Sequence, residues 1–188
     1  MRDVVTKLNK APAYLLMMII LFADQLTKVL VRVNMDMYHS IPVLDKIFGH
    51  TFMLTHVHNT GAAFSIGFSS DLVNRIFFII TTIIALAVII YLLYQSTHRI
   101  QVIAFGLVMG GAWGNLIDRV LYGGVTDFIN VDFPDFIMER FPIFNIADSA
   151  IFIAVTLLII DMLFVKDAPP AVAADEEQEL SPIQTEEI

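Results

Sequence analysis

Two aspartates beside apolar segments could together hydrolyse a peptide bond. Asp127 lies in the segment VTDFI, residues 125–129, and Asp148 lies in the segment FNIAD, residues 144–148. Two carboxylates about 3 Å apart in a site of low dielectric constant cannot both ionise, so one keeps a proton while the other activates water. Such a pair needs neither a metal nor a covalent nucleophile. A proton relay or an ion site would use the same residue types, and that alternative stays open at this point.

Further polar residues fall inside apolar segments, where an ionisable side chain costs at least about 2.5 kcal/mol to insert. Asp24 and Lys28 are spaced i, i+4 and can form an ion pair on one side of a helix. Asn145 and Asp148 share a helix face three residues apart. A second helical segment carries a polar stripe, formed by Gly111, Asn115, Asp118 and Arg119. These residues therefore predict a polar cluster at one membrane face.

Other kinds of site have weaker support. The chain contains no cysteine, which excludes thiolate metal sites and cysteine nucleophiles. His56 and His58 alternate along a predicted strand, but no third ligand lies nearby, so we expect surface histidines and no metal site. The serines lack a Lys or His at the spacing of a serine nucleophile. We expect neither a metal nor another cofactor.

The elements that must position these residues are membrane helices. The chain has 188 residues, of which 57% are apolar and 16% charged, and its mean hydropathy is +0.73. Residues 76–94 and 100–117 contain no charge, and each run is about long enough to cross ~30 Å of hydrocarbon. We predict four spans at about residues 12–33, 76–94, 100–118 and 143–165. Gly106, Gly110 and Gly114 recur every fourth residue, a ladder that lets another helix approach closely.

The distribution of basic residues predicts that both termini are cytoplasmic. Five lie on the side of the termini, against two well inside the opposite segments: Arg2, Lys7, Lys10, Arg99 and Lys166 on the first side, Lys46 and Arg140 on the second. The extracytoplasmic segments are then about residues 34–72 and 120–142. The first contains a β-like stretch at residues 51–58, and Gly61 permits the turn that follows.

The net charge of −8 comes largely from the end of the chain, because seven of the 19 acidic residues follow Lys166. The remainder is almost neutral and has no broad basic surface, so we expect no binding to nucleic acid. We predict one membrane domain at residues 1–166 and a disordered acidic cytoplasmic tail at residues 167–188.

Five blocks resemble those of the bacterial lipoprotein signal peptidases, or signal peptidase II, in the same order. They are residues 24–28 (DQLTK), 59–64 (NTGAAF), 110–119 (GGAWGNLIDR), 125–128 (VTDF) and 144–148 (FNIAD). The resemblance implies an aspartic endopeptidase of the bacterial inner membrane, with its active site near the outer face. Its partners would be membrane lipid and prolipoproteins that carry diacylglycerol on the lipobox cysteine, cut just before that cysteine. We expect a monomer.

The resemblance also implies a role for each matching residue. Asp127 and Asp148 match the catalytic pair. The residues that match the substrate-binding and supporting positions are Asp24, Lys28, Asn59, Gly111, Asn115, Asp118, Arg119, Asn145 and Ala147. The fold implied is four transmembrane helices with a small extracytoplasmic β-like cradle at residues 45–70. The resemblance also implies a lid-like mobile segment at residues 128–142, between the third and fourth helices.

Two other functions would use some of these features. A small ion-coupled transporter could use Asp24, Asp118, Asp127 and Asp148 as a relay, but a relay needs polar residues through the whole membrane, whereas these gather at one face. A structural subunit would not need paired carboxylates.

Overall fold

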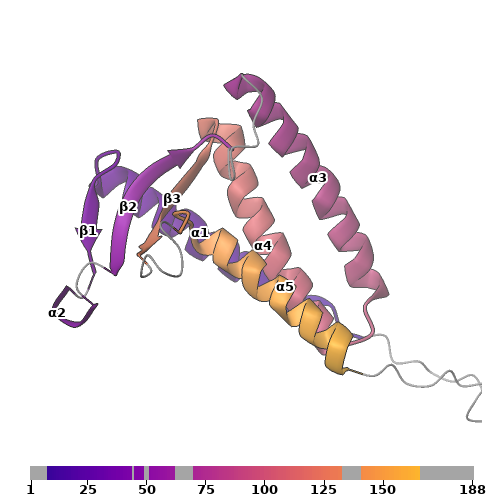
Figure 1. Cartoon of the computed structure of the whole chain (residues 1–188). Helices are drawn as coiled ribbons and strands as arrows, with labels where there is room; N and C mark the ends of the chain where they lie inside the picture. Colours follow the sequence, from indigo (N-terminus) through magenta and orange to yellow (C-terminus); the bar gives the residue numbers. More distant parts are fainter. Residues whose placement is uncertain (1–7, 44, 49–50, 62–69, 133–140, 166–188) are drawn as a thin grey trace, which may run out of the picture.

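The computed structural model describes residues 8–43, 45–48, 51–61, 70–132 and 141–165. Four long helices form a bundle, and a small sheet lies at one end of it (Figure 1). The helices are α1 (Ala11–Asn34), α3 (Asp71–Gln95), α4 (Arg99–Tyr122) and α5 (Ile146–Phe164). Each is long and apolar enough to cross a membrane.

The four predicted spans are confirmed, with differences at the ends. The helices α3 and α4 extend beyond their uncharged runs, because residues such as Asp71 and Arg119 continue the helix past the apolar part. The last helix begins at Ile146 rather than near residue 143. Asn145 stops it from starting earlier, since its side chain accepts a hydrogen bond from the Asp148 backbone N–H at 2.9 Å and caps the helix.

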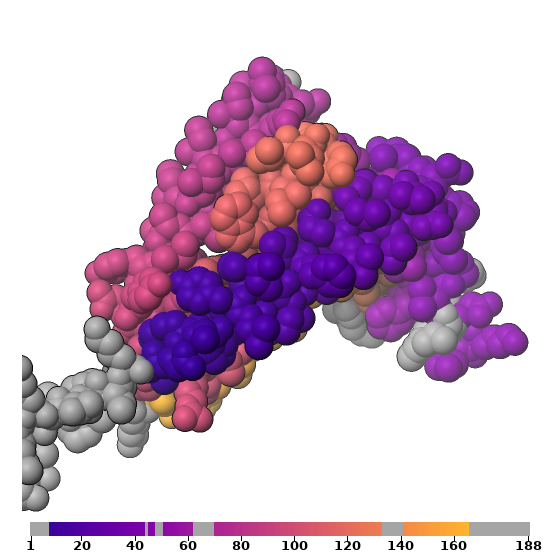
Figure 2. Space-filling model, turned by 180° about the vertical axis from the view of Figure 1, so that it is seen from behind, coloured from indigo at the N-terminus to yellow at the C-terminus, as the bar shows by residue number. Residues whose placement is uncertain are grey.

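The helix α4 is the centre of the bundle and packs against α1, α3 and α5. The predicted glycine ladder lies along its contact with α1: a Cβ atom at Gly106 would lie 2.7 Å from the Ala13 carbonyl oxygen, and one at Gly110 would lie 2.7 Å from Ile20 Cβ. Only glycine lets the two backbones approach this closely. Viewed from behind, α1 runs along the outside of the bundle toward the sheet (Figure 2).

The sheet is antiparallel, in the order β1–β2–β3. Its strands are β1 (Ser40–Pro42), β2 (Phe52–Asn59) and β3 (Val125–Val131), and a single helical turn, α2 (Asp45–Phe48), follows β1. The strand β2 confirms the β-like stretch predicted at residues 51–58. The other two strands were not predicted, and β3 occupies the start of the segment 128–142 expected to be mobile, because residues 125–131 pair with β2. Residues 133–140 and the predicted tail lie outside the described part.

Apolar contacts join the sheet to the bundle. Phe128 of β3 is buried against Val31 and Met35 at the end of α1. The prediction that His56 lies on the surface is wrong: its side chain is buried, and Nδ1 lies 2.9 Å from the Met35 carbonyl oxygen at the end of α1. The sheet is therefore fixed against the same end of α1 that carries Lys28.

The opposite end of the bundle has a separate polar cluster. Asp161 of α5 is buried, and its carboxylate lies 3.0 Å from His98 Nδ1 and accepts a hydrogen bond from Gln101 at 2.7 Å. Close by, Lys10 donates to the Ser96 hydroxyl and backbone carbonyl. Asp161 is thus held by the beginning of α4, about 20 Å along α5 from Asp148.

Candidate active site

Asp127 and Asp148 lie together where β3 meets the beginning of α5. Asn145 contacts both: its Nδ2 donates to Asp127 Oδ1 at 2.6 Å, and its backbone N–H donates to Asp148 Oδ2 at 3.2 Å. Asn115 of α4 donates from Nδ2 to the other Asp148 oxygen, Oδ1, at 2.8 Å. The cap of α5, the start of β3 and Asn115 of α4 thus bring the carboxylates into one site.

The second oxygen of Asp127 is held by the sheet. Asn59, the last residue of β2, donates from Nδ2 to Asp127 Oδ2 at 2.9 Å. Its own Oδ1 accepts the Gly61 backbone N–H at 2.9 Å, and Gly61 has φ of +119°, which favours glycine. All four oxygens of the two carboxylates therefore accept a hydrogen bond from nitrogen, which fixes their orientation.

The environment of Asp127 favours a bound proton. Burial, opposed by the hydrogen bond from Asn59 and reinforced by the negative charge of Asp148, raises the pKa of the Asp127 carboxyl from 3.8 to about 6. The side chain of Asn145 and the charge of Lys28 lower this pKa less strongly than burial raises it. A carboxyl with such a pKa can release and take up a proton near neutral pH.

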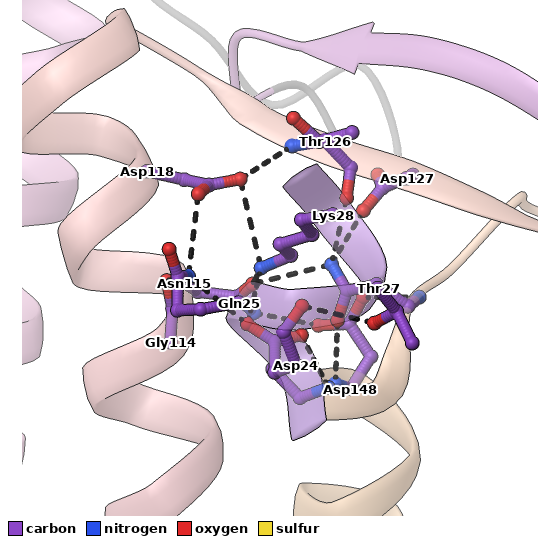
Figure 3. A network of polar contacts seen from close by, with 12 residues as sticks. Asp24, Gln25, Thr27, Lys28, Gly114, Asn115, Asp118, Thr126, Asp127 and Asp148 are labelled. Carbon is purple, nitrogen blue, oxygen red and sulfur yellow. Dashed lines mark hydrogen bonds and ion pairs between the residues drawn. The ribbon is translucent and has the colours of Figure 1, made fainter. Parts of the chain in front are cut away.

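Buried ion pairs surround the carboxylates on the side of α1 (Figure 3). The ammonium group of Lys28 lies 2.8 Å from Asp24 Oδ2 and 3.6 Å from Asp118 Oδ2, and all three side chains are fully buried. Lys28 also donates to Asn115 Oδ1 at 2.8 Å. Asn115 therefore connects the Lys28 charge to Asp148, and the predicted Asp24–Lys28 pair is one part of a larger network.

The same network fixes the beginning of α5. Asp24 Oδ1 accepts the Ala147 backbone N–H at 3.0 Å. Gly111 and Gly114 leave room for this approach: a Cβ atom at Gly111 would lie 2.5 Å from the Ala147 carbonyl oxygen, and one at Gly114 would meet the Asp24 carboxylate. Both glycines are thus required by close packing around the polar residues.

Arg119 lies at the rim of the site. Its guanidinium is 5.0 Å from the centre of the Phe78 ring, and it interacts electrostatically with Asp148 and Asp127. Nη1 lies 3.4 Å from the Asn115 carbonyl oxygen of its own helix. Every residue predicted for the site thus lies in it or in contact with it.

Three further residues of the network were not predicted. Gln25 donates to the Gly114 carbonyl at 3.0 Å and to Asp118 Oδ1 at 3.3 Å, and Thr126 donates its backbone N–H to Asp118 Oδ2 at 2.9 Å. Arg32 lies 3.3 Å from Asp118 Oδ1. Arg32 follows Lys28 by four residues, so the spacing of Asp24, Lys28 and Arg32 along one helix face was a signal in the sequence.

The arrangement suits acid–base catalysis on a bound amide. Two carboxylates lie at the end of the bundle beside the sheet, and a buried lysine and amide side chains hold them. For the described residues, the polar network is confined to this end of α1, α4 and α5, and Asp161 belongs to the separate cluster with His98. A relay through the membrane would need a connection between the two clusters, and Asp161 lies 13 positions after Asp148 in α5.

Comparison with known proteins gives a consistent result. The sequence model described as Signal peptidase (SPase) II matches residues 16–164. The chain is 40% identical to the lipoprotein signal peptidase of Bacillus subtilis (strain 168) over 153 residues, which cover 80% of this chain and 92% of the relative. It is 42% identical to that of Geobacter sulfurreducens over 146 residues, which cover 76% and 86%.

The fold agrees with the sequence comparisons. A solved structure of a bacterial membrane enzyme, determined at 2.3 Å resolution, has a TM-score of 0.70 and is 34% identical, covering 85% of this chain and 94% of its own. A second structure, at 1.9 Å, has a TM-score of 0.69 and 35% identity. The matched residues include both carboxylates and the ion pairs around them, and the chain belongs to the signal peptidase II family of aspartic peptidases.

Proposed function

We propose that this member of the signal peptidase II family, which processes prolipoproteins, cleaves the peptide bond with Asp127 and Asp148 as its catalytic residues. The observation that carries the proposal is the placement of the four carboxylate oxygens. Asn59, Asn115 and Asn145 supply an N–H group to each of them. The oxygens keep further lone pairs, which can accept a proton from water or share one proton between the carboxylates.

The reaction then follows from one shared proton. The ionised carboxylate takes a proton from water as the oxygen attacks the carbonyl carbon, and the protonated carboxyl donates to the carbonyl oxygen. Collapse of the tetrahedral intermediate breaks the C–N bond: the carboxyl that took the proton from water gives it to the leaving amine, and the other carboxylate regains a proton from a hydroxyl of the intermediate. The raised pKa of Asp127 lets the pair hold this proton near neutral pH.

The substrate is a prolipoprotein whose lipobox cysteine carries diacylglycerol, and cleavage occurs just before that cysteine. The site's position supports this substrate. The carboxylates lie at the ends of membrane-spanning helices, beside the sheet. The scissile peptide bond of a prolipoprotein can therefore contact them at the membrane surface while the acyl chains of its diacylglycerol stay in the bilayer.

The site faces the outside of the bacterial cytoplasmic membrane in this proposal, and both termini are cytoplasmic. The chain crosses the membrane four times, so its termini lie on one side. Lys10 and Arg99 lie at the end of the bundle that carries Asp161, away from the catalytic pair, and short basic segments favour the cytoplasm. We also propose that the enzyme acts as a monomer, since one chain supplies all the catalytic side chains.

The test is cleavage of a diacylglyceryl-modified prolipoprotein by purified Asp127→Asn and Asp148→Asn variants. Asparagine is nearly isosteric with aspartate but cannot exchange the proton, so kcat of each variant should fall about 10²- to 10⁴-fold. Asp161→Asn, on the same helix as Asp148, and Asp132→Asn, just after β3, are the matched controls and should stay active. Substantial turnover by either variant of the pair would rule out this mechanism.

A further inference from the structure

Arg32 connects α1 to the strand that carries Asp127, and none of the sequence blocks includes it. Its Nη1 lies 2.9 Å from Thr126 Oγ1, to which it donates, and 3.3 and 3.4 Å from the two oxygens of Asp118. Thr126 directly precedes Asp127. A residue of α1 thus contacts both a carboxylate of α4 and the beginning of β3.

Asp118 completes the connection. It is fully buried, and its Oδ2 accepts the backbone N–H of Thr126 at 2.9 Å. The start of β3 is therefore held twice: by the backbone of Thr126 on Asp118, and by its hydroxyl on Arg32. Arg32, Asp118 and Thr126 form a closed triangle of contacts, which we call the strand clamp.

The clamp also balances charge beside the active site. Asp24 and Asp118 carry two negative charges, and Lys28 and Arg32 carry two positive charges. Lys28 is 2.8 Å from Asp24 but 3.6 Å from Asp118, so Arg32, at 3.3 Å, is the closer cation to Asp118. Without Arg32, Lys28 would be shared by two carboxylates, and one buried negative charge would be left without a full counter-charge.

The guanidinium group suits this position better than an ammonium group would. Its carbon lies 4.3 Å from the centre of the Tyr122 ring, so one face stacks on the aromatic side chain while Nη1 makes the polar contacts. Nη2 is buried and has no hydrogen-bond partner among the described residues. A lysine could not contact the ring and both polar partners together.

From this geometry we infer that Arg32 is a positioning residue of the peptidase, which holds Asp127 in place through Thr126 and offsets the charge of Asp118. Arg32 has no contact with either catalytic carboxylate in the described structure, so it acts through other residues. The inference rests on the proposed pair, Asp127 and Asp148.

Two variants separate the two roles. Arg32→Gln removes the charge and the fork of donors, and Thr126→Val removes only the hydroxyl that accepts from Arg32. Both should lower kcat about 10- to 150-fold, the range for a lost hydrogen bond to a charged group, with KM within about twofold. Arg32→Lys restores the charge but not the fork, so its kcat should recover only in part.

The pH profile distinguishes positioning from a purely structural effect. The charged groups near the pair are Asp24, Lys28, Asp118 and Arg119. Arg32→Gln adds net negative charge to this set, which favours the protonated pair, so the acidic limb of the kcat profile should move to higher pH. Thr126→Val and Arg32→Lys keep the charge and should leave that limb where it is in the unchanged enzyme.

Arg75→Gln is the matched control, because this arginine of α3 donates to the Val120 carbonyl at 2.6 Å but does not contact Asp118. Its kcat and pH profile should be unchanged. Thermal unfolding in detergent reports whether each variant is folded. If Arg32→Gln loses activity only in proportion to its folded fraction, with an unmoved acidic limb, the inference is wrong. If the Arg32 variants behave as expected but Asp127→Asn is active, the proposed pair is wrong.

Discussion

The hydrogen bond from Asn59 to Asp127 offers a direct test of how the sheet serves the site. Asn59 Nδ2 lies 2.9 Å from Asp127 Oδ2, and this bond is the strongest of the influences that lower the pKa of Asp127. Asn59→Ala removes it. Because a hydrogen bond to a charged group contributes about 1.5–3 kcal/mol, we expect kcat to fall about 10- to 150-fold.

The same change should move the pH dependence in a definite direction. The wild-type pKa of Asp127 is about 6, and loss of a donor that stabilises the ionised form raises it further. Because the reaction needs Asp127 protonated, the alkaline limb of the kcat profile should therefore move to higher pH in Asn59→Ala. The assay is initial-rate cleavage of a diacylglyceryl-modified prolipoprotein in detergent micelles across pH 4–9.

Asn130→Ala is the matched control for this prediction. Asn130 lies in β3 and donates from Nδ2 to Thr55 Oγ1 at 2.9 Å, a bond between neutral groups of the same two strands. It should retain wild-type kcat and pH dependence. If both variants lose activity equally, or if Asn59→Ala keeps the wild-type alkaline limb, the sheet does not act through the Asp127 carboxylate.

Three further predictions concern packing, stability and topology. Gly111→Ala should destabilise the bundle by about 1–3 kcal/mol, because the added methyl would lie 2.5 Å from the Ala147 carbonyl oxygen, and an unchanged free energy of unfolding would contradict the packing. The pKa of Asp127 is raised from 3.8 to about 6, so this group contributes most to stability at low pH, where it is protonated. The free energy of unfolding should therefore fall by up to about 3 kcal/mol as the pH rises through about 6. Unfolding of Asp127→Asn across the same pH range should lack this loss. Reporter fusions after residues 12, 60, 97 and 168 should give cytoplasmic, external, cytoplasmic and cytoplasmic signals, and an external signal at 97 would refute the topology.

The four helices could be predicted because uncharged runs of bilayer length have few other interpretations. The cluster of polar residues at one end could also be predicted, since Asp24, Asn115 and Asp148 all fall at the same end of alternating spans. The resemblance supplied the pairing of Asp127 with Asp148. The residues alone could not, because that pairing depends on how β3 meets α5, a contact between segments with no pattern in common.

The sheet was only partly predictable. The strand β2 could be predicted as a β-like stretch that ends before the turn at Gly61, but β1 has three residues, too few for a pattern. The strand β3 follows two glycines directly after α4, so its residues were assigned to a connection. His56 was placed on the surface because nothing in the sequence shows that the Met35 carbonyl, at the end of α1, lies beside it.

The division of the ion pairs among the helices has a consequence for how the protein is made. Membrane proteins enter the bilayer from their N-terminus as they are synthesised. The first helix brings Asp24 and Lys28 already paired within itself, at 2.8 Å, so these two charges offset each other as the helix inserts.

The carboxylates of the later helices then meet partners that are already in place. Asp118 arrives with α4 after Lys28 and Arg32 have entered, and Asp148 arrives with α5 after Asn115. Asp161 comes last, when His98 and Gln101 have already been synthesised. The order of residues along the chain therefore lets Asp118, Asp148 and Asp161 each meet a hydrogen-bond donor that was synthesised earlier. Assembly of the catalytic site and insertion of its charged residues into the membrane are then the same process.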